Sequence, residues 1–114
     1  MDDLVERDGL YYKKFSDVPF TGEIEGMWQG RIKNGVRNGP WLAYYDTGGL
    51  VYKGDYKNGE REGPWVSYWQ NGQLFYKGEY KNDKREGRWV HYGENGDLSI
   101  DFSGVYKDGV KISD

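Results

Sequence analysis

A glycine, one further residue and a tryptophan recur three times in this chain, at intervals of 24 residues. The three copies begin at Gly39, Gly63 and Gly87. Repetition at a fixed period of this length is typical of arrays in which each unit packs only on its neighbours. Other columns keep the same register: Tyr44, Tyr68 and Tyr92; Gly48, Gly72 and Gly96; Leu50, Leu74 and Leu98. The chain is therefore expected to be a tandem array.

The composition favours a thin body over a thick globular core. Of 114 residues, 36% are hydrophobic and 31% are charged, which leaves little aliphatic material to bury. Aromatic residues make up 18% of the chain, and each of them can bury a large amphipathic surface. The buried surface is therefore expected to be mainly aromatic.

Each unit has the pattern of one β-hairpin. In the central copy, residues 65–69 and 74–80 are rich in aromatic side chains, and an Asn-Gly pair lies between them. Polar connectors at residues 57–63 and 81–87 join one hairpin to the next, so consecutive strands should pair antiparallel. The predicted fold is all-β: tandem β-hairpin repeats, with a period of about 24 residues, stacked into a single elongated twisted antiparallel sheet.

Alternation along the second strand of each unit predicts an aromatic face and a mostly charged face. The residues expected on the aromatic face are Leu50, Tyr52, Gly54 and Tyr56 in one copy and Leu74, Tyr76, Gly78 and Tyr80 in the next. Val51 and Phe75 alternate with lysines and are expected on the charged face.

The tryptophan column is expected to be core. Gly54 and Gly78 on neighbouring strands would leave room for the indoles of Trp41, Trp65 and Trp89 to lie across the sheet. The tyrosines at positions 44, 68 and 92 alternate out of phase with these indoles and cannot share their face.

The chain is expected to form a single domain with irregular ends, as terminal units of arrays usually are. Its predicted parts are residues 9–38 as an atypical N-terminal cap and first repeat, 39–62 and 63–86 as regular repeats, and 87–110 as a C-terminal repeat with a two-residue insertion, all within 1–114. Residues 10–14 are expected to be an opening strand, and the residues after Asp108 a short tail. Pro19, Pro40 and Pro64 are expected at the starts of strands.

Charge and residue types exclude several functions. The chain has 16 basic and 19 acidic residues and a net charge of −3, which gives no electrostatic footprint for nucleic acid. It has no cysteine, and the single histidine, His91, is interpreted as a strand residue and not as a base or metal ligand. No catalytic, cofactor or metal site is predicted.

The carboxylates do not indicate an enzyme either. Those in the proposed connectors, Glu60, Glu62 and Glu86, and those on the strands, Asp55 and Glu79, all have Lys or Arg within two residues. Such mixing is typical of a solvated face with weak ion pairs. Membrane association has no support in the sequence, because no apolar run is long enough to cross a bilayer, and the compartment stays open.

The repeated spacing resembles a known family. The residues that carry the resemblance are Tyr52, Gly54, Tyr56, Gly59, Gly63 and Trp65, repeated as Tyr76, Gly78, Tyr80, Gly87 and Trp89. This order is similar to the MORN repeat, and the longer pattern over residues 71–89, with Asp83 in place of a loop glycine, resembles the bacterial MORN-repeat variant. Chains of that kind are commonly labelled YwqK-type antitoxins. The resemblance implies a protein that binds and neutralises a toxin.

The expected function is a non-enzymatic, antitoxin-like module that binds a partner protein. The alternatives are a structural scaffold or dimerisation module, a membrane-associated module, and a carbohydrate binder that uses exposed aromatics. Exposed tyrosine, tryptophan and arginine give the most contact energy at protein interfaces. The candidate partner-binding residues are therefore Tyr44, Tyr45, Tyr68, Trp69 and Tyr92, with Arg61 and Arg85 at the rim.

The edges of such a sheet expose unpaired backbone groups. Lys13 and Lys14 are expected to protect one end, and the inserted residues 99–103 with Lys107 and Lys111 the other. A monomer with weak self-association is therefore expected.

Overall fold

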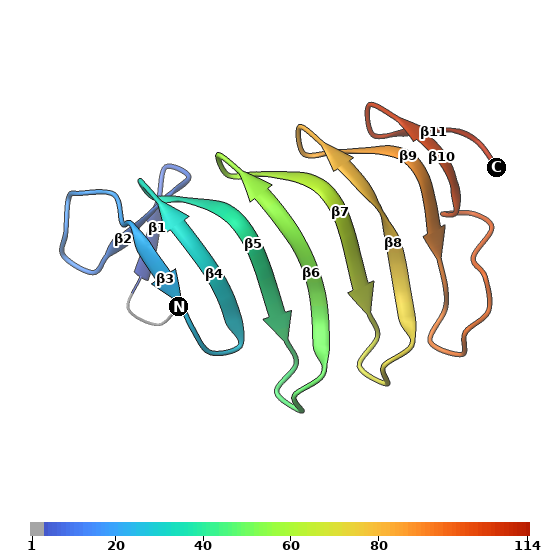
Figure 1. Ribbon diagram of the computed structural model, residues 1–114, viewed down its shortest axis with the longest axis horizontal. Coiled ribbons are helices and arrows are strands. Elements are labelled where there is room, and N and C mark those ends of the chain that lie inside the picture. The colour runs from blue at the N-terminus through green and yellow to red at the C-terminus, as the bar shows by residue number, and fades with distance from the viewer. Residues whose placement is uncertain (1–3) are drawn as a thin grey trace.

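The computed structural model describes residues 4–114, and this part of the chain contains eleven β-strands and no helix (Figure 1). The strands are β1 (Leu4–Arg7), β2 (Leu10–Lys13), β3 (Gly22–Ile24), β4 (Trp28–Lys33), β5 (Val36–Tyr44), β6 (Leu50–Lys57), β7 (Glu60–Tyr68), β8 (Leu74–Lys81), β9 (Lys84–His91), β10 (Gly104–Lys107) and β11 (Val110–Ser113).

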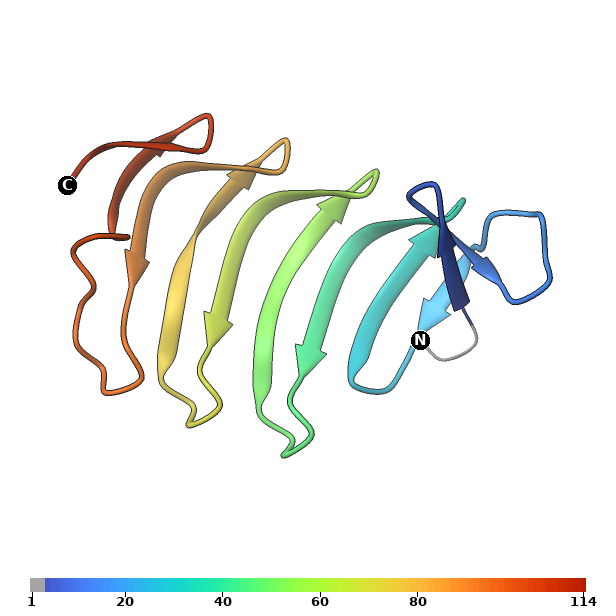
Figure 2. The same cartoon turned by 180° about the vertical axis from the view of Figure 1, so that it is seen from behind.

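The strands β3 to β11 form one nine-stranded antiparallel sheet in chain order, as the sequence predicts. Each strand pairs with the next along the chain, so the units stack side by side into a long, twisted body (Figures 1 and 2). The molecule measures 47 × 33 × 18 Å, which agrees with the thin shape expected from the composition.

The N-terminal end carries a hairpin that the sequence did not indicate in full. The predicted opening strand is β2, but its partner β1 was not expected, and the two form a separate two-stranded sheet. Backbone bonds attach this hairpin to the array, because Tyr11 N donates to Gly35 O at 2.7 Å and Phe20 N donates to Tyr11 O at 2.9 Å. Lys13 and Lys14 therefore do not lie on the N-terminal edge strand of the large sheet, which is β3.

The short tail predicted after Asp108 is wrong, since residues 110–113 form the edge strand β11 on β10. The reason is the turn that precedes it. Asp108 and Gly109 have φ values of 51° and 86°, nearly those of Asn58 and Gly59, at 51° and 85°. Two successive residues with positive φ close a two-residue hairpin, so the chain reverses again.

The connectors predicted at residues 57–63 and 81–87 are too long, because turns of the same kind join these strands. Lys57 pairs directly with Glu60, and Lys81 with Lys84, so each connection is two residues long and residues 60–63 belong to β7. Turns of this kind match the twist of the strands that they join, which explains why longer connectors are unnecessary.

Pro40 and Pro64 lie within β5 and β7, not at the starts of strands as predicted. Gly54 pairs with Trp65 while Asp55 pairs with Glu62, so Gly63 and Pro64 have no partner on β6. A bulge of this kind tolerates proline, because no ladder hydrogen bond is required from it. It also bends the strand: β5, β7 and β9 run across one end of the sheet and then turn sharply (Figure 1).

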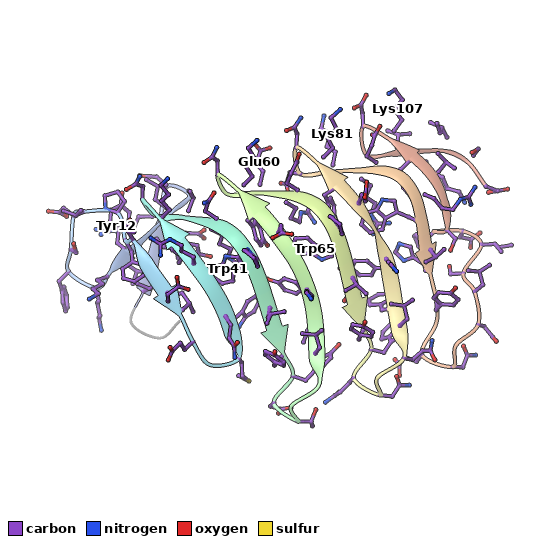
Figure 3. All side chains as sticks on the ribbon, in the orientation of Figure 1. Tyr12, Trp41, Glu60, Trp65, Lys81 and Lys107 are labelled. Atoms are coloured by element: carbon purple, nitrogen blue, oxygen red, sulfur yellow. The ribbon has the colours of Figure 1, made fainter. Side chains whose placement is uncertain are left out.

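The tryptophan column is buried, as predicted. Trp41, Trp65 and Trp89 are 0%, 5% and 0% exposed, and Figure 3 shows the first two at corresponding places in neighbouring units. A Cβ on Gly54 would lie 2.1 Å from the Trp65 ring, and one on Gly78 would lie 2.2 Å from the Trp89 ring. Glycine is therefore required beneath each indole.

Tyrosines from neighbouring strands complete this core. The Tyr52 ring stacks on Trp65 at a centroid distance of 5.0 Å, and the Tyr80 ring meets Trp65 and Trp89 edge-on at 5.4 and 4.9 Å. Because each ring touches the next unit, the aromatic face is packed continuously along the array. We call the opposite side of the sheet the outer face.

A second bulge corrects the predicted alternation in β8, and β6 has the same one. Ser67 pairs with Tyr76 but Tyr68 pairs with Leu74, which leaves Phe75 unpaired. Leu74 and, likewise, Leu50 are therefore cross-strand neighbours of outer-face tyrosines and not part of the aromatic face. The Phe75 ring lies against His91 at 6.1 Å, away from the lysines with which it was grouped.

Candidate functional site

The tyrosines Tyr44, Tyr68 and Tyr92 lie on the outer face, at or just after the ends of β5, β7 and β9, and all three are half-buried. Alternation from Trp41 along β5 places Leu42 and Tyr44 together on this face, and the same holds in β7. Outer-face side chains of one strand thus line up with those of the next unit. These three candidate residues keep the common face that the sequence indicated.

A groove of about 420 Å³ lies on the outer face of the central units. Its apolar part comes from Leu42 and Val66, which are half-buried, and from Pro40 and Pro64, which are exposed. Charged side chains border it. The residues that line it are Pro40, Leu42, Lys53, Gly54, Asp55, Pro64, Trp65, Val66, Lys77 and Gly78. An apolar centre with charged borders is the arrangement found at protein interfaces.

Tyr45 and Trp69 form hydrogen bonds between units. Tyr45 Oη donates to Tyr68 O at 2.8 Å, and Trp69 Nε1 donates to Tyr92 O at 2.8 Å. The Trp69 ring also stacks on Phe75 at 3.9 Å. Both side chains therefore hold one hairpin to the next, and their polar tips are already bonded within the array.

The arginines Arg61 and Arg85 lie on the aromatic face, so the structure separates them from the outer-face tyrosines. The Arg61 guanidinium is 4.1 Å from the centroid of Tyr80, and that of Arg85 is 4.3 Å from the centroid of Trp89. The bend at each bulge folds the start of the strand over the rings, where a half-buried guanidinium gains cation–π contact.

Asp83 completes the surroundings of Arg61. Its Oδ1 lies 2.5 Å from Arg61 Nε and also accepts a bond from the Arg61 backbone N at 3.2 Å. Burial by itself would raise the pKa of Asp83, but the hydrogen bonds from Arg61 outweigh it and hold this pKa below its usual value.

Sequence reasoning missed the role of two carboxylates. Glu62 accepts a hydrogen bond from the backbone N of Asn82 at 2.8 Å, and Glu86 accepts one from Asp108 N at 3.2 Å. Both were interpreted as solvated residues of a connector, but they lie in strands and cap the next two-residue turn. Their shared place in the 24-residue register was the available signal.

His91 lies in β9 and is 7% exposed. Its Nε2 is 2.6 Å from Arg85 Nη1, and its ring stacks on Tyr76 at 5.2 Å. Burial, and secondly the charge of Arg85, lower the pKa of His91 from 6.5 to about 4. The imidazole is therefore neutral in the folded protein at pH 7.

This lowered pKa predicts a loss of stability in acid. Between pH 6.5 and about 4 the unfolded chain binds a proton at His91 that the folded chain does not bind, so the free energy of unfolding falls as the pH falls through this window. Thermal melts of the wild type and His91→Gln across this range should show the wild type losing more stability. Parallel curves for the two proteins would contradict the prediction.

In the part of the chain that the structure describes, no group of three or more His, Cys, Asp or Glu residues is placed to hold a metal ion. Residues 4–114 also include no helix that is long and apolar enough to span a bilayer.

Comparison with known families agrees with the repeat register. Residues 37–58 and 61–82 each match the model described as the MORN repeat variant. The first match spans β5 and β6 and the second spans β7 and β8, so each covers one hairpin. A search of curated proteins gives no match. Repeats of this type are generally non-enzymatic modules that bind proteins or membranes.

Proposed function

We propose that this chain is a protein-binding module that holds a partner protein against the outer face of its central repeats. The observation that carries the proposal is the apolar groove across β5 to β8, with Tyr44 and Tyr68 on the same face. Contact energy at interfaces concentrates in a few side chains, chiefly aromatic ones, and an apolar centre excludes water around them. A surface that combines both across two units suits a protein partner.

The aromatic face is less suited to this role, because its rings already pack on one another. Trp41 and Trp89 are 0% exposed; Tyr56 of the neighbouring strand packs on Trp41, and Arg85 of the same strand lies over Trp89. On the outer face, in contrast, Pro40 and Pro64 are exposed. The burial of the indoles also removes support for a carbohydrate site on the tryptophan column.

We further propose that the bound partner is a toxin and that binding neutralises it. This role is supported by the resemblance of residues 71–89 to the bacterial repeat variant, and it requires that the bound partner lose an activity. A scaffold would bind its partner without changing that activity, so the two roles differ in a measurable way.

Capture from the source cells with matched variants tests the proposal. The double variant Val66→Lys with Tyr68→Ala alters the outer face. Glu60→Ala is the control, because Glu60 is exposed and lies beside the two-residue turn between β6 and β7 (Figure 3). We expect the double variant to bind the captured partner at least about 30-fold more weakly, as removal of a contact hot spot does, while Glu60→Ala binds normally. Melting temperatures must first show that both variants are folded.

Equal binding by the wild type and the double variant would contradict an outer-face site. If the partner binds but keeps its own activity in the complex, the neutralising role is wrong and scaffolding is favoured.

A further inference from the structure

Three arginines occupy the same place in successive units: Arg37, Arg61 and Arg85. Within residues 4–114, only Arg61 among them forms a salt bridge, and its partner is Asp83. The Asp83 carboxylate accepts hydrogen bonds from both the guanidinium and the backbone N–H of Arg61. This pair shows how a carboxylate fits beside an arginine of this column.

One unit earlier, Gly59 takes the place of Asp83 beside Arg37. The backbone contact is the same in both units, since Gly59 N donates to Arg37 O at 2.9 Å and Asp83 N donates to Arg61 O at 3.0 Å. Gly59 has no side chain to reach the arginine. A hollow of about 270 Å³ lies there, lined by Glu6, Gly9, Tyr11, Val36, Arg37, Tyr56 and Gly59.

The hydrogen-bond partners of the Arg37 guanidinium are all neutral. Its Nη1 donates to Tyr56 Oη at 3.1 Å and to Tyr52 Oη at 3.4 Å, and its Nη2 donates to Tyr11 Oη at 3.4 Å. The side chain is half-buried, and no carboxylate of the described residues lies within salt-bridge distance of it. A half-buried cation among neutral groups binds an anion more strongly than an exposed cation does.

Arg85 differs, because His91 occupies its Nη1 at 2.6 Å. Arg37 therefore combines three features. Its guanidinium forms hydrogen bonds only with tyrosine hydroxyl groups, the residue beside it is a glycine, and a hollow adjoins both.

We propose that the hollow beside Arg37 and Gly59 binds a carboxylate of a partner molecule, in the place that Asp83 fills in the next unit. The ligand is an acidic side chain or the C-terminal carboxylate of a protein chain. The site goes beyond the proposed outer-face contact and does not depend on it, because Arg37 lies on the aromatic face.

Titration of the isotope-labelled protein with sodium acetate tests this site directly. In the wild type, we expect saturable shifts of the Arg37 side-chain Nε–H and of the Arg37 and Gly59 backbone amides, with sodium chloride at equal ionic strength as the control. Asp83→Gly should open a second site, so that Arg61 responds to acetate as Arg37 does. No saturable shift at Arg37 in the wild type would overturn the proposal.

Gly59→Asp places an internal carboxylate beside Arg37 and should weaken the acetate response at Arg37 by about tenfold or more. Gly59 has a φ of 85°, where a side chain is strained, although Asp83 has a φ of 68° in the equivalent place. A Cβ at Gly59 would also lie 3.3 Å from Val36 Cβ, so Asp83→Gly serves as the test if this variant does not fold. An unchanged response at Arg37 in folded Gly59→Asp would overturn the proposal.

Glu6 lines the hollow and could itself fill it in solution. A wild type that ignores acetate together with a Glu6→Gln variant that responds would show this, and would overturn the external site. Two ligands then identify the source of the carboxylate. N-acetyl-aspartate amidated at its α-carboxyl group represents an acidic side chain, and N-acetylglycine represents a chain end. Saturable binding of either supports the site. Tighter binding of inorganic phosphate than of every carboxylate would overturn the assignment.

Discussion

Replacement of Trp65 by alanine is expected to lower the free energy of unfolding by about 3–5 kcal/mol, the usual cost of deleting a buried aromatic side chain. Trp65 is 5% exposed and contacts the rings of Tyr52, Tyr56 and Tyr80 at 5.0, 5.4 and 5.4 Å. It belongs to a central unit, so both neighbouring units lose packing with it. Urea unfolding followed by circular dichroism measures the change.

Trp28→Ala is the matched control, because this indole is 39% exposed and lies near one end of the array. Its truncation should cost clearly less. Equal losses for the two variants would show that Trp65 is not a special part of the core.

Gly54→Ala is expected to destabilise the protein by about 3 kcal/mol, the upper end of the usual range for overpacking. The added Cβ would lie 2.1 Å from Trp65 Cε3, so the indole has to leave its place on the strand. Gly49→Ala is the control, since its Cβ meets only Tyr45, at 3.9 Å. Both substitutions are measured by the same urea unfolding.

The combination of Gly54→Ala with Trp65→Ala adds a second test. Because the added methyl group clashes only with the indole, which Trp65→Ala removes, the double variant should be about as stable as Trp65→Ala alone. Fully additive losses would mean that Gly54 acts through something other than the indole.

The repeat in the sequence was sufficient to predict the sheet, the antiparallel order and the glycine–tryptophan pairs. It could not locate the bulges at Pro64 and Phe75, since alternation assumes an unbroken period of two. The bulge at Pro64 bends β7 and brings Arg61 over the aromatic face, and this explains why Arg61 does not lie with the outer-face tyrosines.

For the candidate site, the phase of Tyr44 and Tyr68 relative to the tryptophans was readable from the sequence. The hydrogen bonds of Tyr45 and Trp69 could not be predicted from the sequence. Each joins residues 23 positions apart, and it depends on the conformation of the turn that follows Tyr45 or Trp69. Asp83 was visible as a departure from the repeat, but its bond to Arg61 depends on the two-residue turn and the bend of β7.

Mapping of the partner's contacts on the isotope-labelled chain tests the central claim most directly. Addition of the partner captured by the wild type should perturb the amides of Leu42, Val66 and Tyr68 on the outer face, and these shifts should be lost when Val66→Lys and Tyr68→Ala are combined. Perturbation confined to the aromatic face, or to the two-residue turns, would contradict the account.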